Sequence, residues 1–362
     1  MKPRILHIAP MNTSGVPGQF VLAERKLGFH SRLITLFRDK RSYFEDICLD
    51  LPFIDFTITR MVKKLVSSPD KLVVDSTLRI PDKIPPQWQP HSVLEQMLVA
   101  LRDRLWKPKI ERAIRQYGLD QYDVYQLDGG LDFYRFPRFI PQMKKRGKKI
   151  ICCYTGSDLR TRGVIPQIDA LADVTVSVEF DHLKLHPRIH HVFFPFDASA
   201  FEPKQQTKSD KLFIGHAPTN WQAKGSHIIV PVLERLAKEY PVEVVLIENM
   251  PYAEALKAKQ NLDIFVDQIG DLGYGINSLE ALAMAIPTCS CLAPGFEEAY
   301  PDHPFVVIDE NNIYDKLVQL IVNSDLRFEL GRKGRAWVLA HHSAVESVRR
   351  IHKLAGIPDE AE

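Results

Sequence analysis

The sequence predicts an α/β protein built from two doubly wound domains. Its 362 residues are enough for about two domains of 100–200 residues each. Short apolar runs alternate with amphipathic segments along most of the chain, as in parallel sheets covered by helices. A mostly polar stretch at 196–210 interrupts this alternation and is typical of a linker. We therefore predict domains at 1–203 and 204–340, followed by a C-terminal helical segment at 341–362.

The predicted strands are short and almost continuously apolar, which is typical of strands buried on both faces of a sheet. Between the runs at 211–215 and 242–247, the segment Ile228–Leu236 has one apolar face and predicts a helix. Proline-rich residues 67–91 predict a surface excursion of the first domain. The expected strands are Ile5–Ala9, Leu33–Phe37, Val124–Leu127, Lys149–Tyr154, Val174–Val178, His191–Phe194, Lys211–Gly215, Val242–Ile247, Ile264–Asp267, Pro287–Cys291 and Phe305–Val307.

Composition and charge exclude several classes of protein. A net charge of +2 is too small to favour nucleic acid as a partner. Basic runs at 60–64, 102–115 and 144–149 are typical of solvated helix faces, although they leave peripheral contact with a membrane open. Five cysteines without CxxC spacing predict reduced thiols and no metal site.

The N-terminal apolar run predicts a strand rather than a signal peptide. No stretch approaches the roughly 18 uninterrupted apolar residues of a membrane-spanning helix. We expect a soluble cytoplasmic protein, with peripheral contact at the inner membrane face left open.

A glycine-containing loop follows the first predicted strand. Its residues Gly15 and Gly18 precede a helix, where backbone N–H groups are free to meet an anion. The loop lacks the GxGxxG pattern of dinucleotide-binding proteins. A tight turn between strand and helix explains it equally well.

A second loop follows the first strand of the second domain. It contains Lys224 and Gly225, which are suited to a phosphate because they supply a point charge and close backbone approach. Ligands of open α/β sheets bind at this edge. The competing explanation of Lys224 is an ordinary solvent-exposed loop lysine, which is what residue type alone would predict.

A third segment, Asp267–Thr288, has three glycines before an alanine-rich helix. N–H groups near Gly273–Gly275 are suited to a diphosphate. Glu280, predicted in the first turn, could accept hydrogen bonds from two ribose hydroxyls. The competing explanation is a capping box, because Asn277–Glu280 has its spacing.

The second and third segments together resemble the retaining GT-B glycosyltransferases of the group 1 type, or family four. His216–Asn220 with Lys224–Gly225 matches the first family motif, and Gly273–Gly275 with Leu279–Ala283 matches the second. The resemblance covers about residues 149–355. Residues carried over as nucleotide-binding are His216, Asn220, Lys224, Gly225, Gly273, Tyr274, Gly275 and Glu280, to which we add Gly15 and Gly18 as weaker candidates.

The resemblance implies a GT-B fold, in which two Rossmann-like domains face a central cleft. The first domain is then expected to bind a saccharide, glycan or lipid-linked acceptor, and the second a UDP- or GDP-linked sugar. Transfer would proceed with retention and without a metal or other cofactor, and the last helix would cross back to the first domain. Two residues depart from the family motifs: Trp221 stands in place of an arginine, and Leu272 in place of the first of two glutamates.

Tyr154–Arg162 resembles the family segment on the acceptor side. Asp158 could accept a sugar hydroxyl, and Arg160 or Arg162 could pair with phosphate. Asp128, at the end of another strand, is a second candidate acceptor. With Lys224, these two aspartates are the catalytic candidates. An ion pair that fixes a loop explains Asp158 equally well. A structural role in a turn explains Asp128 equally well.

Three other functions remain open. A nucleotide-sugar epimerase would use the same donor site without an acceptor. A non-catalytic sugar-nucleotide-binding protein would explain Trp221 and Leu272. A dinucleotide-dependent oxidoreductase fits least well because its fingerprint is missing.

Overall fold

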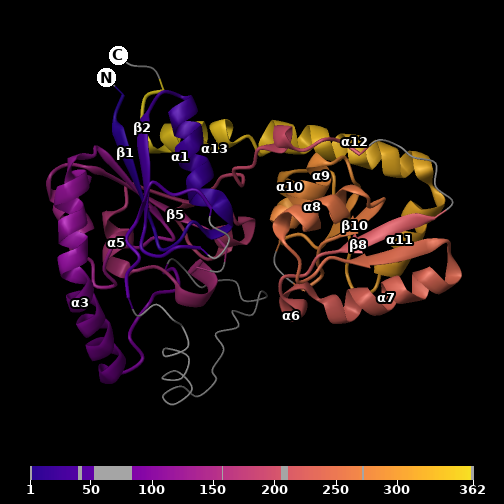
Figure 1. Ribbon diagram of the computed structural model, residues 1–362, viewed down its shortest axis with the longest axis horizontal. Helices are drawn as coiled ribbons and strands as arrows, with labels where there is room; N and C mark the ends of the chain where they lie inside the picture. The colour runs from indigo at the N-terminus through magenta and orange to yellow at the C-terminus, as the bar shows by residue number, and fades with distance from the viewer. Residues whose placement is uncertain are drawn as a thin grey trace. The chain divides into compact units, whose positions relative to one another are not determined.

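The computed structural model describes residues 2–39, 43–52, 84–156, 158–204, 211–270 and 273–359. The chain divides into two compact units. Unit 1 comprises Met1–Pro195 with Ala344–Glu362, and unit 2 comprises Phe196–Ser343. Each unit contains one sheet, and every strand pair in both sheets is parallel. Figure 1 shows helices packed around each sheet.

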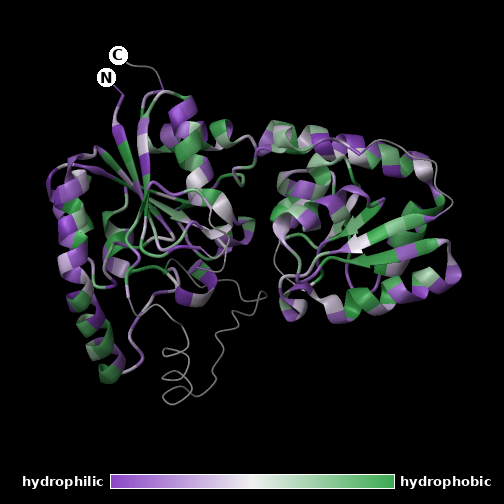
Figure 2. Ribbon diagram, in the orientation of Figure 1, coloured by the Kyte–Doolittle hydropathy of each residue, from purple (hydrophilic) through white to green (hydrophobic). Residues whose placement is uncertain are grey.

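The sheet of unit 1 has the strand order β3-β2-β1-β4-β5-β6-β7. Its strands are β1 Arg4–Ala9, β2 His30–Thr35, β3 Ile47–Cys48, β4 Val124–Asp128, β5 Lys149–Tyr154, β6 Val174–Ser177 and β7 Ile189–His191. The α-helices of this unit are α1 Val16–Lys26, α3 Val93–Tyr117, α4 Phe139–Lys145, α5 Pro166–Leu171 and α13 Ala344–Ala355. Two clusters of buried apolar residues pack against the sheet. Figure 2 colours many of its strand residues as hydrophobic.

The sheet of unit 2 has the order β12-β11-β10-β8-β9. Its strands are β8 Leu212–His216, β9 Val242–Leu246, β10 Ile264–Val266, β11 Thr288–Ser290 and β12 Val306–Val307. The α-helices of this unit are α6 Trp221–Lys224, α7 Ser226–Glu239, α8 Tyr252–Gln260, α9 Ile276–Ala283, α10 Phe296–Ala299, α11 Ile313–Val322 and α12 Ser324–His341.

The eleven strands expected from sequence all overlap observed strands, with ends that differ by a few residues. The prediction omitted β3, whose two residues are too few to show a periodic pattern. Two parallel α/β units agree with the predicted fold class.

The unit boundaries differ from the predicted residues 203 and 340. The first lies at 195/196 because Phe201 packs in the core of unit 2 and its carbonyl accepts a hydrogen bond from Arg335, 2.6 Å away. The second lies at 343/344. Helix α13 packs in unit 1, where the Ser347 hydroxyl donates to the Phe193 carbonyl at 2.9 Å.

Some predicted features lie wholly or partly outside the described residues. They are the basic run at 60–64, most of the proline-rich stretch at 67–91, linker residues 205–210 and Leu272.

Candidate functional site

The loops after β8 and β10 meet at the point where the strand order of unit 2 reverses. From β8 the chain crosses to β9 on one side and then returns to β10 on the other. Connections that leave two adjacent parallel strands in opposite directions open a crevice at their carboxyl ends, where ligands of such sheets bind. Lys224 follows β8, and Asp267 and Gln268 follow β10 directly.

Lys224 lies at the centre of this edge. Its ammonium group donates to Asp267 Oδ1 at 3.0 Å and to Gln268 Oε1 at 2.6 Å. Asp267 Oδ2 in turn accepts from the Ser278 hydroxyl at 2.6 Å and from the Gly275 N–H at 3.3 Å. An ammonium has three N–H donors; two of them fix the side chain, and no described residue accepts the third.

The electrostatics of this cluster favour an ionised Asp267. Burial by itself would raise the pKa of Asp267, but Lys224 and the hydrogen bonds from Ser278 and Gly275 lower it below its usual value. Gln268 is fully buried, and its Nε2 group has no hydrogen-bond partner. Since Lys224 can only donate, it fixes the carbonyl end of this amide and leaves the N–H donors unpaired.

Two glycines allow the loops to approach each other closely. Gly225 has a φ of +67°, and a Cβ there would lie 2.9 Å from the Gly270 nitrogen. If Gly275 carried a side chain, its Cβ would lie 3.9 Å from Lys224 Nζ. The ammonium therefore lies at the N-terminus of α9. A Cβ on Gly273 would meet no atom of the described residues within 4 Å.

His216 and Asn220, predicted to bind the nucleotide, make contacts within the protein. His216 is fully buried; its Nδ1 donates to the Val266 carbonyl and its Nε2 accepts from the Ser226 hydroxyl, both at 2.8 Å. Burial lowers the pKa of His216, which favours the neutral ring. Asn220 caps α6, its side-chain oxygen accepting from the Ala223 N–H at 3.1 Å. Both residues shape the loop around Lys224.

Glu280 does not form the capping box considered from the sequence. Helix α9 begins at Ile276 with Gly275 as its N-cap and no capping side chain, so Glu280 lies beyond the first turn and no capping box forms. Its side chain is buried in an ion pair with Lys259 and accepts from the Tyr252 hydroxyl at 2.8 Å. Lys259 also donates to Asn277 Oδ1 at 2.9 Å. The ribose contact predicted for Glu280 stays a prediction.

Two aromatic residues of the family motifs also contact the protein. The Tyr274 ring lies 4.6 Å from that of Phe305, centroid to centroid, and its hydroxyl is 3.2 Å from His342 Nε2. The Trp221 indole is half-exposed and donates to Glu248. Trp221, which stands in place of the arginine of the motif that the sequence resembles, thus contacts a carboxylate.

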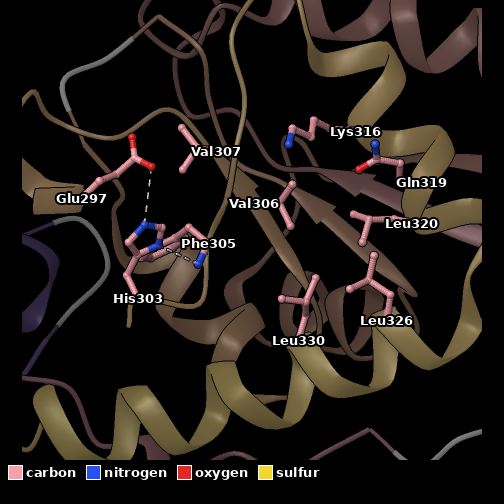
Figure 3. A pocket seen from close by; sticks show the side chains of 10 residues that line it. All are labelled: Glu297, His303, Phe305, Val306, Val307, Lys316, Gln319, Leu320, Leu326 and Leu330. Carbon is pink, nitrogen blue, oxygen red and sulfur yellow. Dashed lines mark hydrogen bonds and ion pairs between the residues drawn. The ribbon is translucent and has the colours of Figure 1, made fainter. Parts of the chain in front are cut away.

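A separate hollow in unit 2 is lined by residues of β12, α11 and α12 and their neighbours, and none of the predicted site residues lines it. Figure 3 shows His303 within 3.8 Å of Glu297 at one end of the hollow and apolar side chains at the other. Its lining residues are Glu297, His303, Phe305, Val306, Val307, Lys316, Gln319, Leu320, Leu326 and Leu330.

In unit 1, the predicted catalytic residue Asp128 belongs to a buried network. His7 lies between two carboxylates, with Nδ1 3.0 Å from Asp128 Oδ2 and Nε2 3.0 Å from Glu24 Oε2. His352 of α13 lies 3.2 Å from the other oxygen of Glu24. Gln126 donates to Asp128 at 2.9 Å. The network therefore links α13 to α1, β1 and β4.

The network should make folding stability depend on pH. Burial alone would lower the pKa of His7 and raise that of Glu24. Their mutual attraction, helped by Asp128 and His352, instead raises the pKa of His7 to about 10 and lowers that of Glu24 to about 2. The contribution of His7 is complete below pH 6.5 and is lost as the pH rises through 10. That of Glu24 is complete above pH 4.5 and is lost as the pH falls through 2.

We therefore expect His7→Gln to destabilise the protein most between pH 4.5 and 6.5 and progressively less toward pH 10. Urea unfolding at pH 5.5, 7.5 and 9 measures this. His190→Gln is the matched control, because His190 is an exposed histidine of the same unit. Parallel pH curves for wild type and His7→Gln would exclude a charged His7.

Asp158 lies beside the loop that follows Asp128. It begins the helical turn Asp158–Arg162, and a Cβ on Gly129 would lie 3.2 Å from its Oδ2. Burial raises the pKa of Asp158. Arg160 is held by Asp181 at 2.6 Å and Glu179 at 2.9 Å, whereas Arg162 donates to the Gly129 and Gly163 carbonyls.

In the glycine-containing loop of unit 1, the Asn12 side chain packs against Gly18. Gly15 has a φ of +76° and is the N-cap of α1. The Gly18 N–H donates to Asn12 Oδ1 at 3.1 Å, and a Cβ on Gly18 would lie 2.7 Å from Asn12 Nδ2. These glycines permit the turn and its packing, and anion binding here stays a prediction.

Sequence reasoning missed Lys259, Tyr252 and His7 as partners in these clusters, and it did not select Asp267 or Gln268. A carboxylate directly after a buried strand, at the same sheet edge as Lys224, was the available signal for Asp267. Among the described residues there is no group of three or more His, Cys, Asp or Glu suited to a metal. Within the same residues, no helix is long and apolar enough to cross a membrane. The five cysteines are free.

No family model matches the sequence, and no curated protein matches it significantly. Solved structures do resemble the fold. Alr3699/HepE from Anabaena, in complex with UDP and glucose, aligns with a TM-score of 0.57 at 10% identity, over 98% of this chain and 99% of that one. Sucrose-phosphate synthase from Thermosynechococcus elongatus aligns with a TM-score of 0.56 at 12% identity, over 97% and 98%.

WaaG, a glycosyltransferase involved in lipopolysaccharide biosynthesis, aligns with a TM-score of 0.54 at 10% identity, over 97% of this chain and all of that one. These likenesses span both units, and one of the three proteins, WaaG, is a glycosyltransferase by name. They confirm the fold predicted from sequence: the chain has the GT-B fold.

Proposed function

We propose that this chain is a glycosyltransferase that takes a sugar from a nucleoside diphosphate, with the donor bound by unit 2 and the acceptor by unit 1. The observation that carries the proposal is Lys224, whose ammonium is held at the N-terminus of α9 by Asp267 and Gln268. A fixed cation beside helix N–H groups is suited to a diphosphate. The GT-B fold of nucleotide-sugar enzymes supports it.

In this reaction the bond between the anomeric carbon and a diphosphate oxygen breaks, and an acceptor hydroxyl oxygen bonds to that carbon and gives up its proton to the leaving diphosphate or to water. Negative charge develops on the leaving diphosphate. Lys224 and the first-turn N–H groups of α9 would stabilise that charge as it forms, which lowers the barrier more than uniform binding would. We further propose that transfer needs no metal and retains the anomeric configuration. The donor is a UDP- or GDP-linked sugar and the acceptor a saccharide, glycan or lipid-linked saccharide.

A second candidate function is non-catalytic binding of a nucleotide sugar. Asp267 favours it, because this carboxylate already accepts from Lys224, Ser278 and Gly275. A diphosphate would have to share those donors. Trp221, which holds Glu248 at the rim, adds further negative charge.

Incubation of the full chain with UDP-, GDP- and ADP-sugars distinguishes these functions. Transfer or slow hydrolysis of one donor is expected for the transferase. Binding in calorimetry without turnover would support the non-catalytic protein, and an isomerised donor would support an epimerase. Failure of every nucleotide to bind would refute the donor site in unit 2.

A further inference from the structure

Arg135, a partly buried arginine of unit 1, has a buried guanidinium nitrogen without a hydrogen-bond partner. Arg135 lies in the loop after β4, with its guanidinium carbon 5.2 Å from the centroid of the Trp88 ring. Its Nη1 atom is buried and makes no hydrogen bond. Arg135 forms no ion pair with another described residue, whereas Arg102, Arg160 and Arg188 of the same unit do. Buried charges are normally paired, so this donor calls for an acceptor.

The neighbouring acidic side chains are engaged elsewhere. Asp103 uses one oxygen for Arg102 at 2.9 Å and the other for the Phe136 N–H at 3.1 Å. Glu95 accepts from the His91 N–H at 2.8 Å, and Asp158 is 3.5 Å from the Thr155 hydroxyl. Of these three acids only Asp103 accepts a hydrogen bond from the loop that carries Arg135, and among the described residues none of them pairs with the Arg135 guanidinium.

Two other arginines, Arg162 and Arg102, lie near enough to Arg135 to repel its charge. Arg162 donates to the Gly129 carbonyl, at the start of the loop that carries Arg135. Trp88, whose ring lies beside the Arg135 guanidinium, donates its backbone N–H to the Val164 carbonyl at 2.8 Å. The pKa of Arg135 is lowered to about 9, chiefly by burial and then by Arg162 and Arg102, against the opposing effect of Asp103 and Glu95. The nearby carboxylates therefore do not compensate the buried charge.

This cluster lies at the carboxyl edge of its sheet. The loop 129–138 follows β4, and the turn Asp158–Arg162 follows the adjacent strand β5. Ligands of parallel sheets bind at that edge. A planar guanidinium presents parallel N–H donors that match two oxygens of one phosphate or carboxylate.

We propose that Arg135, with Arg162 beside it, binds an oxyanion, and that the acceptor of this chain carries a phosphate or carboxylate group. The oxyanion site depends only on the geometry of unit 1. The assignment of the oxyanion to the acceptor rests on the proposed transferase function.

Thermal unfolding in inorganic phosphate, compared with chloride at equal ionic strength, tests the site. A ligand that binds only the folded state raises the midpoint in proportion to its occupancy. We expect a saturable rise for the wild type and for Lys224→Met. For Arg135→Met, the phosphate concentration at half-saturation should increase at least tenfold. In chloride, Arg135→Met should be as stable as the wild type or more stable, because it removes an unpaired buried charge.

Arg138→Met is the matched control, since Arg138 is an exposed arginine of the same loop that also packs on an aromatic ring, that of Tyr134. It should keep the phosphate response. Arg135→Gln repeats the test with a polar side chain in case the methionine variant does not fold. An equal phosphate response in wild type and both Arg135 variants would overturn the site.

Calorimetric titration of UDP and GDP into Arg135→Met separates the two parts of the proposal. If Arg135→Met binds nucleotides as tightly as the wild type but loses the stabilisation by phosphate, the oxyanion belongs to the acceptor. A tenfold loss of nucleotide affinity would assign it to the donor and overturn the acceptor assignment. If the wild type binds phosphate through Arg135 but binds no nucleotide, the proposed function fails while the oxyanion site stands.

Discussion

Replacing Lys224 with alanine is expected to lower turnover roughly 100- to 1,000-fold, the range found when one pre-organised donor to a developing charge is removed. The ammonium is the only side-chain cation recorded against Asp267 and Gln268 among the described residues. Nucleoside affinity should change much less, because the sugar and base carry no charge for Lys224 to neutralise. Initial rates and calorimetric titration with nucleoside and nucleoside diphosphate measure the two effects.

Lys238→Ala is the control for this substitution, because Lys238 is an exposed lysine on the following helix. Losing Lys224 also leaves the buried carboxylate of Asp267 without its cation, so the single variant should be less stable. The double variant Lys224→Ala/Asp267→Asn should regain stability without regaining turnover. Equal losses in turnover and nucleoside affinity would instead give Lys224 a purely binding role.

Lys259→Met is expected to lower the free energy of unfolding by about 3–5 kcal/mol, the cost of leaving one partner of a buried ion pair uncompensated. Lys259 and Glu280 are each no more than 2% exposed, so water cannot solvate the carboxylate that remains. Lys259→Met also removes the hydrogen bond to Asn277, whose amide donates to the Ala217 carbonyl after β8. Urea unfolding measures the loss.

Lys257→Met, an exposed substitution on the same helix, should change stability little. The double variant Lys259→Met/Glu280→Leu should recover most of the loss, because apolar residues of similar size can replace a buried pair at small net cost. A loss below about 1 kcal/mol for Lys259→Met would be typical of a solvent-exposed pair and would contradict the buried pair.

The strands could be predicted because each is a compact apolar run, and Lys149–Tyr154 has the predicted ends. The order of the strands could not. His7 and Asp128 are 121 positions apart, and they meet only because β1 and β4 are neighbours. Nothing in the local pattern around either residue indicates this pairing.

The same limit applies to the donor site. Lys224 and the start of α9 were both expected at the carboxyl edge of the sheet, and the adjacency of β8 and β10 brings them together. The pairing of Glu280 with Lys259 was missed because residue type predicts an exposed lysine on α8. The start of α9 was misplaced because the spacing of Asn277 and Glu280 imitates a capping box, whereas the extended Gly275 is the N-cap and the helix begins at Ile276.

Hydrogen exchange of backbone amides with and without UDP- and GDP-sugars tests the central claim most directly, because it needs no substitution. The account predicts added protection in peptides covering Ala217–Gly225 and Gly273–Leu279, the two segments that meet around Lys224. Protection confined to other segments of unit 2, such as the hollow lined by His303 and Lys316, would contradict it.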